Sequence, residues 1–328
     1  MRPCLKGICL NLILLRSIVA GSILFASFAH ASTDNAAGVA VTPVKLSAHC
    51  YYVQGQSGAA SSANQGYMSN AGFIITPVGV VVFDALGTPP LAEALIAQIR
   101  KLTALPIKYV IVSHFHADHF YGLQAFKALG AEIWAQERGQ EYFLGPDVDR
   151  RLAQRRDELF PWVDENTKLL RADKWLKGDI DLKFGGLDLQ IRYVGPAHSP
   201  EDTVLFVKQD RVLYAGDLVF QGRVPFVGDA DSKSWLKALD KLLAFNPKVL
   251  VPGHGAVSLK PRADLTLTRD YLAYLRLNMG RAVNDFVPFE EAYQKTNWRR
   301  FQSLPAFDQA NRLNAYNTYL LMEKESLK

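Results

Sequence analysis

The segment His114-Phe115-His116-Ala117-Asp118-His119 is the part of this chain from which a fold can first be inferred. It directly follows the apolar run 109–112, which is typical of a buried strand that ends in a loop. Imidazole and carboxylate groups hold zinc in open, reactive sites, and α/β proteins place their chemistry at the carboxyl ends of strands. A solvated polar loop is the alternative, but ligand types at i, i+2, i+4 and i+5 favour a metal site.

Two further histidines and one aspartate also follow strand-like runs. His198 and His254 lie in turns that contain glycine and proline, and Asp217 follows Gly216. Glycine beside a ligand lets the backbone turn tightly and brings the side chain inward. A lone loop histidine is usually a surface residue, and an aspartate after glycine usually caps a turn. Together with the 114–119 cluster, these residues are better explained as ligands.

Strand and helix patterns alternate through residues 50–251. Strands are predicted at 50–53, 72–76, 80–83, 107–112, 131–134, 180–184, 187–194, 203–208, 212–215 and 249–251, and helices at 90–102, 119–129 and 232–245. The charged segment 138–168 is predicted to be helical, with breaks at its prolines. Residues 54–65 are rich in Gly, Ser, Ala and Gln, which predicts either a flap over the site or a plain hairpin loop.

Only helical patterns remain after Pro261, at 265–279, 289–295 and 307–324. Such an extension covers an exposed face of the fold, or it walls a substrate pocket or a dimer contact.

The first 31 residues predict a secretory signal peptide. An apolar run at 17–28 follows basic residues, and Ala29-His30-Ala31 is a small-x-small cleavage signal. The run is shorter than the roughly 20 residues of a spanning helix, so we expect a secreted or periplasmic protein without a stable membrane anchor. Removing Arg2, Lys6 and Arg16 takes the formal net charge from +5 to +2, which argues against nucleic acid as a partner.

These residues resemble the metallo-β-lactamase superfamily over residues 72–255. The resemblance rests on Asp84 after a strand, the 114–119 segment, His198, Gly216-Asp217 and Gly253-His254-Gly255. It implies an α/β fold, the αβ/βα sandwich in which two mixed sheets face each other with helices outside and metal ions at one edge. We therefore expect a signal peptide at 1–31, a metallo-β-lactamase-fold domain at 32–260, and a helical C-terminal extension at 261–328 packed on that domain.

Carried over residue by residue, the resemblance implies two zinc ions. His114, His116 and His198 would bind the first ion, Asp118, His119 and His254 would bind the second, and Asp217 would bridge them. Asp118 is also the candidate catalytic residue, because it would orient the nucleophile or move a proton. Asp84 would orient a ligand without binding metal itself. Iron or manganese stay open as alternatives, since nitrogen and oxygen ligands accept several metals.

The substrate is less well specified. The flanking residues are similar to zinc β-lactamases of the broad-spectrum subclass, but that subclass has cysteine at Asp217, a carboxylate-binding lysine at Phe220 and arginine at His119. The segment 216–223 is similar to exported metallohydrolases associated with quinoproteins and sulfur oxidation. Arg223 is a candidate for pairing with a substrate carboxylate, or else an ordinary surface arginine.

We expect a hydrolase that acts on a small molecule and uses a metal-bridging hydroxide to cleave a small ester, thioester or lactam. Three alternatives stay open: a β-lactamase proper, a mononuclear iron dioxygenase acting on persulfides, and a non-catalytic exported metal-binding partner. The oligomeric state is open as well.

Overall fold

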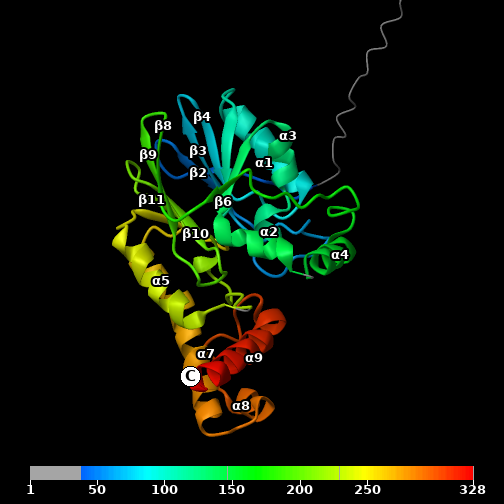
Figure 1. The fold of residues 1–328 in the computed structure, drawn as a ribbon, viewed down its shortest axis with the longest axis vertical. Helices are drawn as coiled ribbons and strands as arrows, with labels where there is room; N and C mark the ends of the chain where they lie inside the picture. The colour runs from blue at the N-terminus through cyan, green and yellow to red at the C-terminus, as the bar shows by residue number, and fades with distance from the viewer. Residues whose placement is uncertain (1–37, 146, 229, 328) are drawn as a thin grey trace, which may run out of the picture. The chain divides into compact units, whose positions relative to one another are not determined.

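Two mixed β-sheets form the centre of the structure, a computed structural model that describes residues 38–145, 147–228 and 230–327 (Figure 1). The first sheet has the strand order β1-β2-β3-β4-β5-β6-β7, and the second has the order β12-β11-β10-β9-β8. The predicted signal peptide, residues 1–31, lies outside the described residues. Among the described helices, none combines the length and the apolar character that a membrane crossing requires.

The strands are β1 (Val44–Lys45), β2 (Cys50–Val53), β3 (Ala71–Thr76), β4 (Gly79–Phe83), β5 (Ile107–Ile111), β6 (Glu132–Gln136), β7 (Lys174–Leu176), β8 (Ile180–Phe184), β9 (Leu187–Tyr193), β10 (Thr203–Val207), β11 (Val212–Tyr214) and β12 (Val249–Val251). The helices are α1 (Pro89–Leu102), α2 (Ala117–Phe120), α3 (Leu123–Ala128), η1 (Glu137–Leu144), α4 (Asp147–Leu159), η2 (Gly216–Leu218), α5 (Ser232–Ala244), α6 (Pro261–Asp264), α7 (Thr266–Asn284), α8 (Phe289–Lys295) and α9 (Phe307–Ser326).

Parallel pairing brings several strand ends to one edge of the molecule. In the first sheet, β4, β5, β6 and β7 pair in parallel, and parallel neighbours require crossover connections, which α1 to α4 supply. In the second sheet, β11 and β12 are parallel, and β9 runs in the same direction because both β9 and β11 pair antiparallel with β10. The segments that follow β4, β5, β9, β11 and β12 carry all the predicted site residues up to His254.

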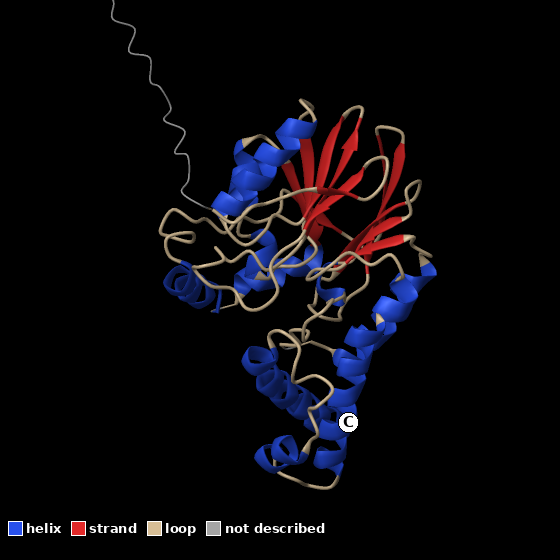
Figure 2. Ribbon diagram, turned by 180° about the vertical axis from the view of Figure 1, so that it is seen from behind, coloured by secondary structure: helices blue, strands red, loops and turns tan. Residues whose placement is uncertain are grey.

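The two sheets share one apolar interior. Along β4, Val81 and Phe83 belong to the cluster between the sheets, whereas Val80 and Val82 pack against α1. This alternation follows from the period of two residues in a strand. On the opposite side, α5 covers the outer face of the second sheet through Trp235 and its neighbours. Figure 2 shows the strands between the two layers of helices, so the predicted αβ/βα sandwich is confirmed.

Two predicted elements were wrong in detail. The helix predicted at 119–129 is two short helices, α2 and α3, separated at Gly122. A Cβ atom at Gly122 would lie 2.0 Å from the carbonyl oxygen of Ala85, so the turn between the helices packs tightly on that backbone. The segment predicted to be helical over 138–168 is helical only as far as Leu159, just before the predicted break at Pro161, and the chain then continues without regular structure to the short strand β7, which was not predicted.

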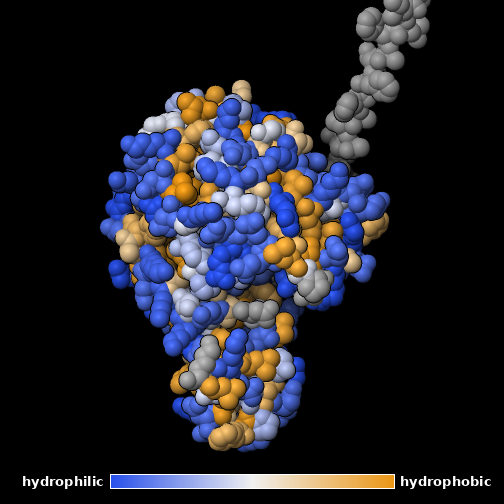
Figure 3. Space-filling model, viewed as in Figure 1, coloured by the Kyte–Doolittle hydropathy of each residue, from blue (hydrophilic) through white to orange (hydrophobic). Residues whose placement is uncertain are grey.

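The C-terminal helices hold residues 224–228, which follow Asp217 in the chain. α7 packs against both α5 and α9. Asn314 of α9 donates to the carbonyl oxygen of Pro225 (2.7 Å) and accepts from the amide of Val227 (2.9 Å). The extension therefore anchors residues 224–228, while the domain boundary at 260 stays a prediction. Figure 3 shows apolar side chains gathered on the surface of these helices, and the exposed large ones are Leu277, Phe286, Leu313, Tyr316, Leu320 and Leu327.

Candidate metal centre

The structure brings all seven predicted ligand side chains together at one edge of the sandwich. They form two groups, and within each group the ligand atoms lie within 4.8 Å of one another. The first group is His114, His116, His198 and Asp217, and the second is Asp118, His119 and His254.

In the first group, three imidazole nitrogens converge on one point. His116 Nδ1 lies 3.0 Å from His114 Nε2 and 2.9 Å from His198 Nε2, and Asp217 Oδ2 lies 3.4 Å from His198 Nε2. One ring nitrogen carries either a proton or a lone pair, so His116 Nδ1 cannot hydrogen-bond to both neighbours. Tetrahedral zinc with Zn–N bonds near 2 Å separates its ligand atoms by about 3.3 Å. The spacing therefore fits a shared cation better than a hydrogen-bond network.

The second group meets the first at Asp217. Asp118 Oδ2 lies 3.5 Å from His119 Nε2 and 3.3 Å from His254 Nε2. Asp217 Oδ1 lies 3.0 Å from His119 Nε2, while its Oδ2 lies 3.2 Å from His254 Nε2 and also faces His198 in the first group. A carboxylate with an oxygen toward each group has the geometry of a bridging ligand.

Several of these polar atoms are buried with no hydrogen-bond partner among the described residues: Asp118 Oδ2, His119 Nε2, His198 Nδ1 and Asp217 Oδ1. An unpaired buried polar atom costs about 1–3 kcal/mol. Three of these four atoms are ones that the geometry above directs at a cation. The donor set and its unpaired atoms both fit bound divalent metal.

Asp84 and Ser113 set the orientation of one imidazole in each group. Asp84 Oδ2 accepts from His119 Nδ1 at 2.9 Å and from Ser113 Oγ at 2.8 Å. Because the Ser113 hydroxyl donates to Asp84, it accepts from His114 Nδ1, which lies 2.9 Å away. Both rings then carry their proton on Nδ1 and keep Nε2 free for metal. Asp84 has the orienting contact predicted for it, whereas Ser113 was missed, and its only sequence signal is its place between β5 and the histidine segment.

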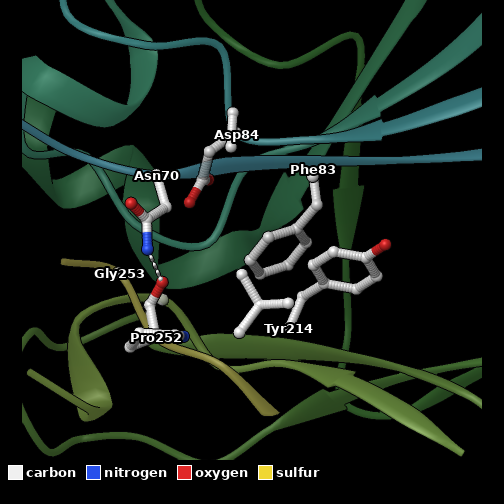
Figure 4. A pocket seen from close by; sticks show the side chains of 10 residues that line it. Asn70, Phe83, Asp84, Tyr214, Pro252 and Gly253 are labelled. Atoms are coloured by element: carbon white, nitrogen blue, oxygen red, sulfur yellow. Dashed lines mark hydrogen bonds between the residues drawn. The ribbon is translucent and has the colours of Figure 1, made fainter. Parts of the chain in front are cut away.

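The third fixed imidazole is that of His254. Its Nδ1 lies 2.7 Å from the carbonyl oxygen of Met68, which leaves Nε2 for metal. The side-chain amide of Asn70 donates to the carbonyl oxygens of Pro252 and Gly255, each at 2.8 Å, and so holds the turn that carries His254. Figure 4 shows Asn70 directed at this turn, close to Asp84. Sequence reasoning missed Met68 and Asn70 because their contacts join segments far apart in the chain.

Gly253 allows the carboxylate of Asp217 to approach the His254 turn. A Cβ atom at this position would lie 1.9 Å from Asp217 Oδ1, closer than any real contact. The glycine is therefore required by the close approach of a predicted ligand, and its backbone amide also donates to the Gly216 carbonyl at 2.7 Å.

Burial and charge set the protonation of the cluster. Burial lowers the pKa of His116 to about 4 and that of His198 to about 3, so both imidazoles are neutral at pH 7, the form that binds metal. Burial raises the pKa of Asp217, but the imidazoles of His254 and His119 outweigh it and hold that pKa well below its usual range. Burial lowers the pKa of His119 and His254, yet the nearby carboxylates prevail and raise both, so a cation that binds their Nε2 atoms would displace protons from these two rings.

Arg223 lies beside the second group and is 4% exposed. Its Nη1 donates to the carbonyl oxygen of Gly58 at 2.8 Å and lies 3.4 Å from His254 Nδ1. Burial lowers the pKa of its guanidinium, which the carboxylates of Asp217 and Asp118 oppose. The surface alternative for Arg223 is therefore wrong, while its role toward substrate stays a prediction.

Two phenylalanines differ in their relation to the site. Phe220 is fully buried, and its ring stacks on His254 with centroids 5.0 Å apart and planes 5° from parallel. Phe226 is 37% exposed, and its ring centroid lies 5.9 Å from that of His116. Phe220 therefore packs against the imidazole of His254 inside the protein, whereas Phe226 gives the site an accessible apolar edge.

Comparison with known proteins gives this arrangement a family. The family model described as the metallo-beta-lactamase superfamily matches residues 64–254. The chain is 28% identical over 257 residues to a linear primary-alkylsulfatase of Pseudomonas sp. (strain ATCC 19151), covering 68% of this chain and 48% of that protein. It therefore spans about half the length of that relative. It is 26% identical over 238 residues to metallo-beta-lactamase IND-1 of Chryseobacterium indologenes, covering 71% of this chain and 88% of that protein.

Solved structures show the same fold. A metallo-beta-lactamase from Pontibacter korlensis superposes with a TM-score of 0.56 at 22% identity, covering 71% of this chain and 99% of its own. The sec-alkylsulfatase Pisa1 from Pseudomonas sp. superposes with a TM-score of 0.65 at 19% identity, covering 86% of this chain and 50% of its own. The sandwich, the paired groups at its edge and the family match lead to one conclusion: this chain belongs to the metallo-beta-lactamase superfamily.

Proposed function

We propose that this chain is a hydrolase that holds two zinc ions in its ligand cluster and cleaves a small ester, thioester or lactam. The observation that carries the proposal is Asp217, which places an oxygen toward each of two ligand groups while one of its oxygens has no hydrogen-bond partner among the described residues. His114, His116 and His198 would hold one ion, and Asp118, His119 and His254 would hold the other. Bound there, the ions supply Lewis acidity, which makes water nucleophilic near neutral pH and polarises the substrate.

The two carboxylates have different tasks in this proposal. The Asp118 side chain is 13% exposed, whereas that of Asp217 is 4% exposed. Burial raises the pKa of Asp118, but His119 and His254 outweigh it and hold the carboxyl ionised. Because it is ionised and more exposed, Asp118 is the carboxylate that can accept a hydrogen bond from the attacking water and orient it, while Asp217 stays a structural bridge.

β-Lactams are the least favoured of these substrates. At the position where broad-spectrum zinc β-lactamases carry a lysine for the substrate carboxylate, Phe220 is buried and stacked on His254. The Phe220 side chain is uncharged, so it cannot pair with a lactam carboxylate as that lysine does.

A second candidate is hydrolysis of sulfate esters. The alkylsulfatase relative is 28% identical to this chain. The fold likeness to sec-alkylsulfatase Pisa1 covers 86% of this chain, which is more than residues 1–260 alone could supply, so it extends into the C-terminal helices. An exposed apolar edge at Phe226 suits an alkyl chain beside the charged centre.

The test is a substrate panel on one preparation of the mature protein. The panel holds nitrocefin, S-lactoylglutathione, an acyl lactone and a primary alkyl sulfate, and the preparation is expected to carry about two transition-metal equivalents per chain. Chelation should abolish turnover and zinc should restore it. Full activity without metal, or one iron per chain with oxygen uptake on a persulfide, would contradict the proposal. Bound metal with no turnover of any substrate would favour a non-catalytic metal-binding role.

We also propose that the chain is exported after cleavage before Ser32, without a membrane anchor and without nucleic acid as a partner. Support comes from the sequence of residues 1–31 and the nearly balanced charge that remains. Expression in a Gram-negative host should yield a periplasmic protein whose N-terminus is Ser32. A full-length N-terminus in the cytoplasmic fraction would contradict this.

A further inference from the structure

The connection between β2 and β3 lies along the second ligand group. At its C-terminal end, the carbonyl oxygen of Met68 contacts His254, and the Ser69 hydroxyl donates to the carbonyl oxygen of Asp118. Its earlier part, residues 56–63, consists of small and polar residues that are mostly exposed. This part has little apolar surface to bury, so hydrogen bonds must hold it in place.

The tip of this connection is held at two positions. On one side, the Gly58 carbonyl oxygen accepts from Arg223 Nη1 at 2.8 Å. On the other side, Ser62 contacts the segment after α4: its carbonyl oxygen accepts from Trp162 Nε1 at 2.8 Å, and its hydroxyl donates to the Phe160 carbonyl oxygen at 2.7 Å. Of these two contacts, the one with Arg223 involves a residue that also lies next to a predicted metal ligand, His254.

Arg223 contacts both the tip of the connection and the surroundings of His254. Its guanidinium lies 5.9 Å from the centre of the Phe220 ring, and that ring stacks on His254. The same Nη1 that contacts Gly58 lies 3.4 Å from His254 Nδ1. A planar, buried guanidinium held on several sides has one orientation, unlike a flexible lysine. Gly58, Arg223, Phe220 and His254 thus form one continuous contact from the tip to the ligand cluster.

We propose that Arg223 is a positioning residue that fixes the tip of the 54–65 loop beside the His254 side of the metal centre, and so forms the wall against which substrate binds. Its effect on catalysis rests on the proposed hydrolase function, whereas its effect on the loop does not. The loop is accordingly an ordered flap, held on the metal side by one buried cation and on the other side by the contacts of Ser62.

Hydrogen exchange of the full mature chain, both metal-free and zinc-loaded, tests this directly. The amides of Gln56, Gln65 and Gly66 are hydrogen-bonded within the connection and report its opening. In R223M, they should exchange about ten- to a hundredfold faster, since one charge-assisted hydrogen bond is lost. R223K, which keeps the charge without the planar fork, should lie between R223M and the wild type. Elastase nicking within 59–63 should rise in the same order.

W162F is the matched control, because it removes one of the two hydrogen bonds that hold the other side of the tip, without touching the ligand cluster. It should speed exchange at Gln65 and Gly66, and it should raise KM in the same direction as R223M but less. A rise in KM for R223M with wild-type loop exchange would overturn the proposal, because Arg223 would then act as a direct anion ligand. Wild-type exchange in both R223M and R223K would overturn it as well. Absence of turnover on every substrate would reject only the hydrolase function, since the exchange result stands on metal-free protein.

Discussion

At the scale of single residues, the site has two kinds of side chain. The sequence indicates the candidate ligands, but it does not indicate the residues that hold those ligands in place. Each of the seven ligand candidates follows a strand and has a ligating side chain, so pattern and chemistry both point to it. Ser113, Met68 and Asn70 act by contacts with other segments. Asn70, for example, reaches the carbonyl oxygen of Gly255, 185 residues away. A local pattern holds no information about such a contact, whichever residue supplies it.

Asp84 and Ser113 should affect the two ligand groups differently. S113A removes the partner of His114 Nδ1 and one donor to Asp84, whose bond to His119 remains, so we expect about a tenfold loss of zinc affinity, chiefly at the first group. D84N disturbs His119 directly and His114 through Ser113, so both affinities should fall, by about 10- to 100-fold. Competition between a chelator and the protein for zinc, started from metal-free protein, measures the zinc affinity of both ligand groups.

S258A is the control for that experiment, because Ser258 is a buried serine whose hydroxyl bonds Asp264, outside the ligand cluster. Zinc affinity in S113A equal to that in S258A would show that the Ser113 contact does not orient His114.

Gly253 should tolerate no side chain. In G253A, the new methyl group would collide with Asp217 Oδ1, so the bridge should be displaced and bound zinc should fall by at least one equivalent per chain. G145A offers a matched change, since a Cβ atom there would meet nothing closer than the Tyr142 carbonyl oxygen at 4.0 Å. Elemental analysis of the two purified variants decides the matter, and an unchanged zinc content in G253A would contradict the bridging role.

At the scale of elements, strands and helices with a regular local pattern were predicted correctly. Elements that depend on contacts with distant segments were not. The hairpin of β8 and β9 across Gly185-Gly186 and the strand β12 were predicted because alternation and turn glycines are local signals. The helix predicted at 119–129 failed at Gly122, where the backbone of Ala85 comes close. β7 was missed because its three residues, Lys-Trp-Leu, form no apolar run, whereas the equally short β12 reads Val-Leu-Val.

Asp210 joins the two sheets and gives stability a pH dependence. Its carboxylate accepts from the His49 amide at 3.0 Å and from Ser47, both in the β1–β2 connection. Burial raises the pKa of Asp210, but these hydrogen bonds outweigh it and lower it overall. A lowered folded-state pKa stabilises the fold above the unfolded value of about 3.9, and this contribution is lost as pH falls through the folded value.

D210N should therefore lower the free energy of unfolding by about 1 kcal/mol at pH 7. The difference from wild type should shrink at pH 3, where the wild-type carboxyl begins to protonate. Urea denaturation at the two pH values measures it. An equal difference at both values would mean that the charge of Asp210 is not what stabilises the junction.

At the scale of the whole molecule, the sandwich and its helical extension were predicted, but not the way in which they meet. The patterns that define α7, α8 and α9 are local, whereas the buried polar contacts that attach them are not. Asn314 is fully buried and also lies 2.9 Å from the Tyr271 hydroxyl of α7, so one side chain joins α9, α7 and the 224–228 segment. The extension thus supports a segment that contains Phe226 and directly follows Arg223.

N314A should destabilise this junction, because it leaves the Val227 amide and the Pro225 carbonyl unpaired. We expect a loss of about 1–3 kcal/mol in the free energy of unfolding. N278A, which removes a hydrogen bond made within α7 alone, should cost less. Equal losses in both variants, measured by urea denaturation, would show that the extension is not anchored through Asn314.

We propose that two cations lie side by side and share Asp217. Crystals of the zinc-loaded protein, measured at the zinc absorption edge, would locate them. We expect two anomalous peaks flanking Asp217, one among His114, His116 and His198 and the other among Asp118, His119 and His254. One peak alone, or peaks that leave Asp217 without a metal on either side, would contradict it.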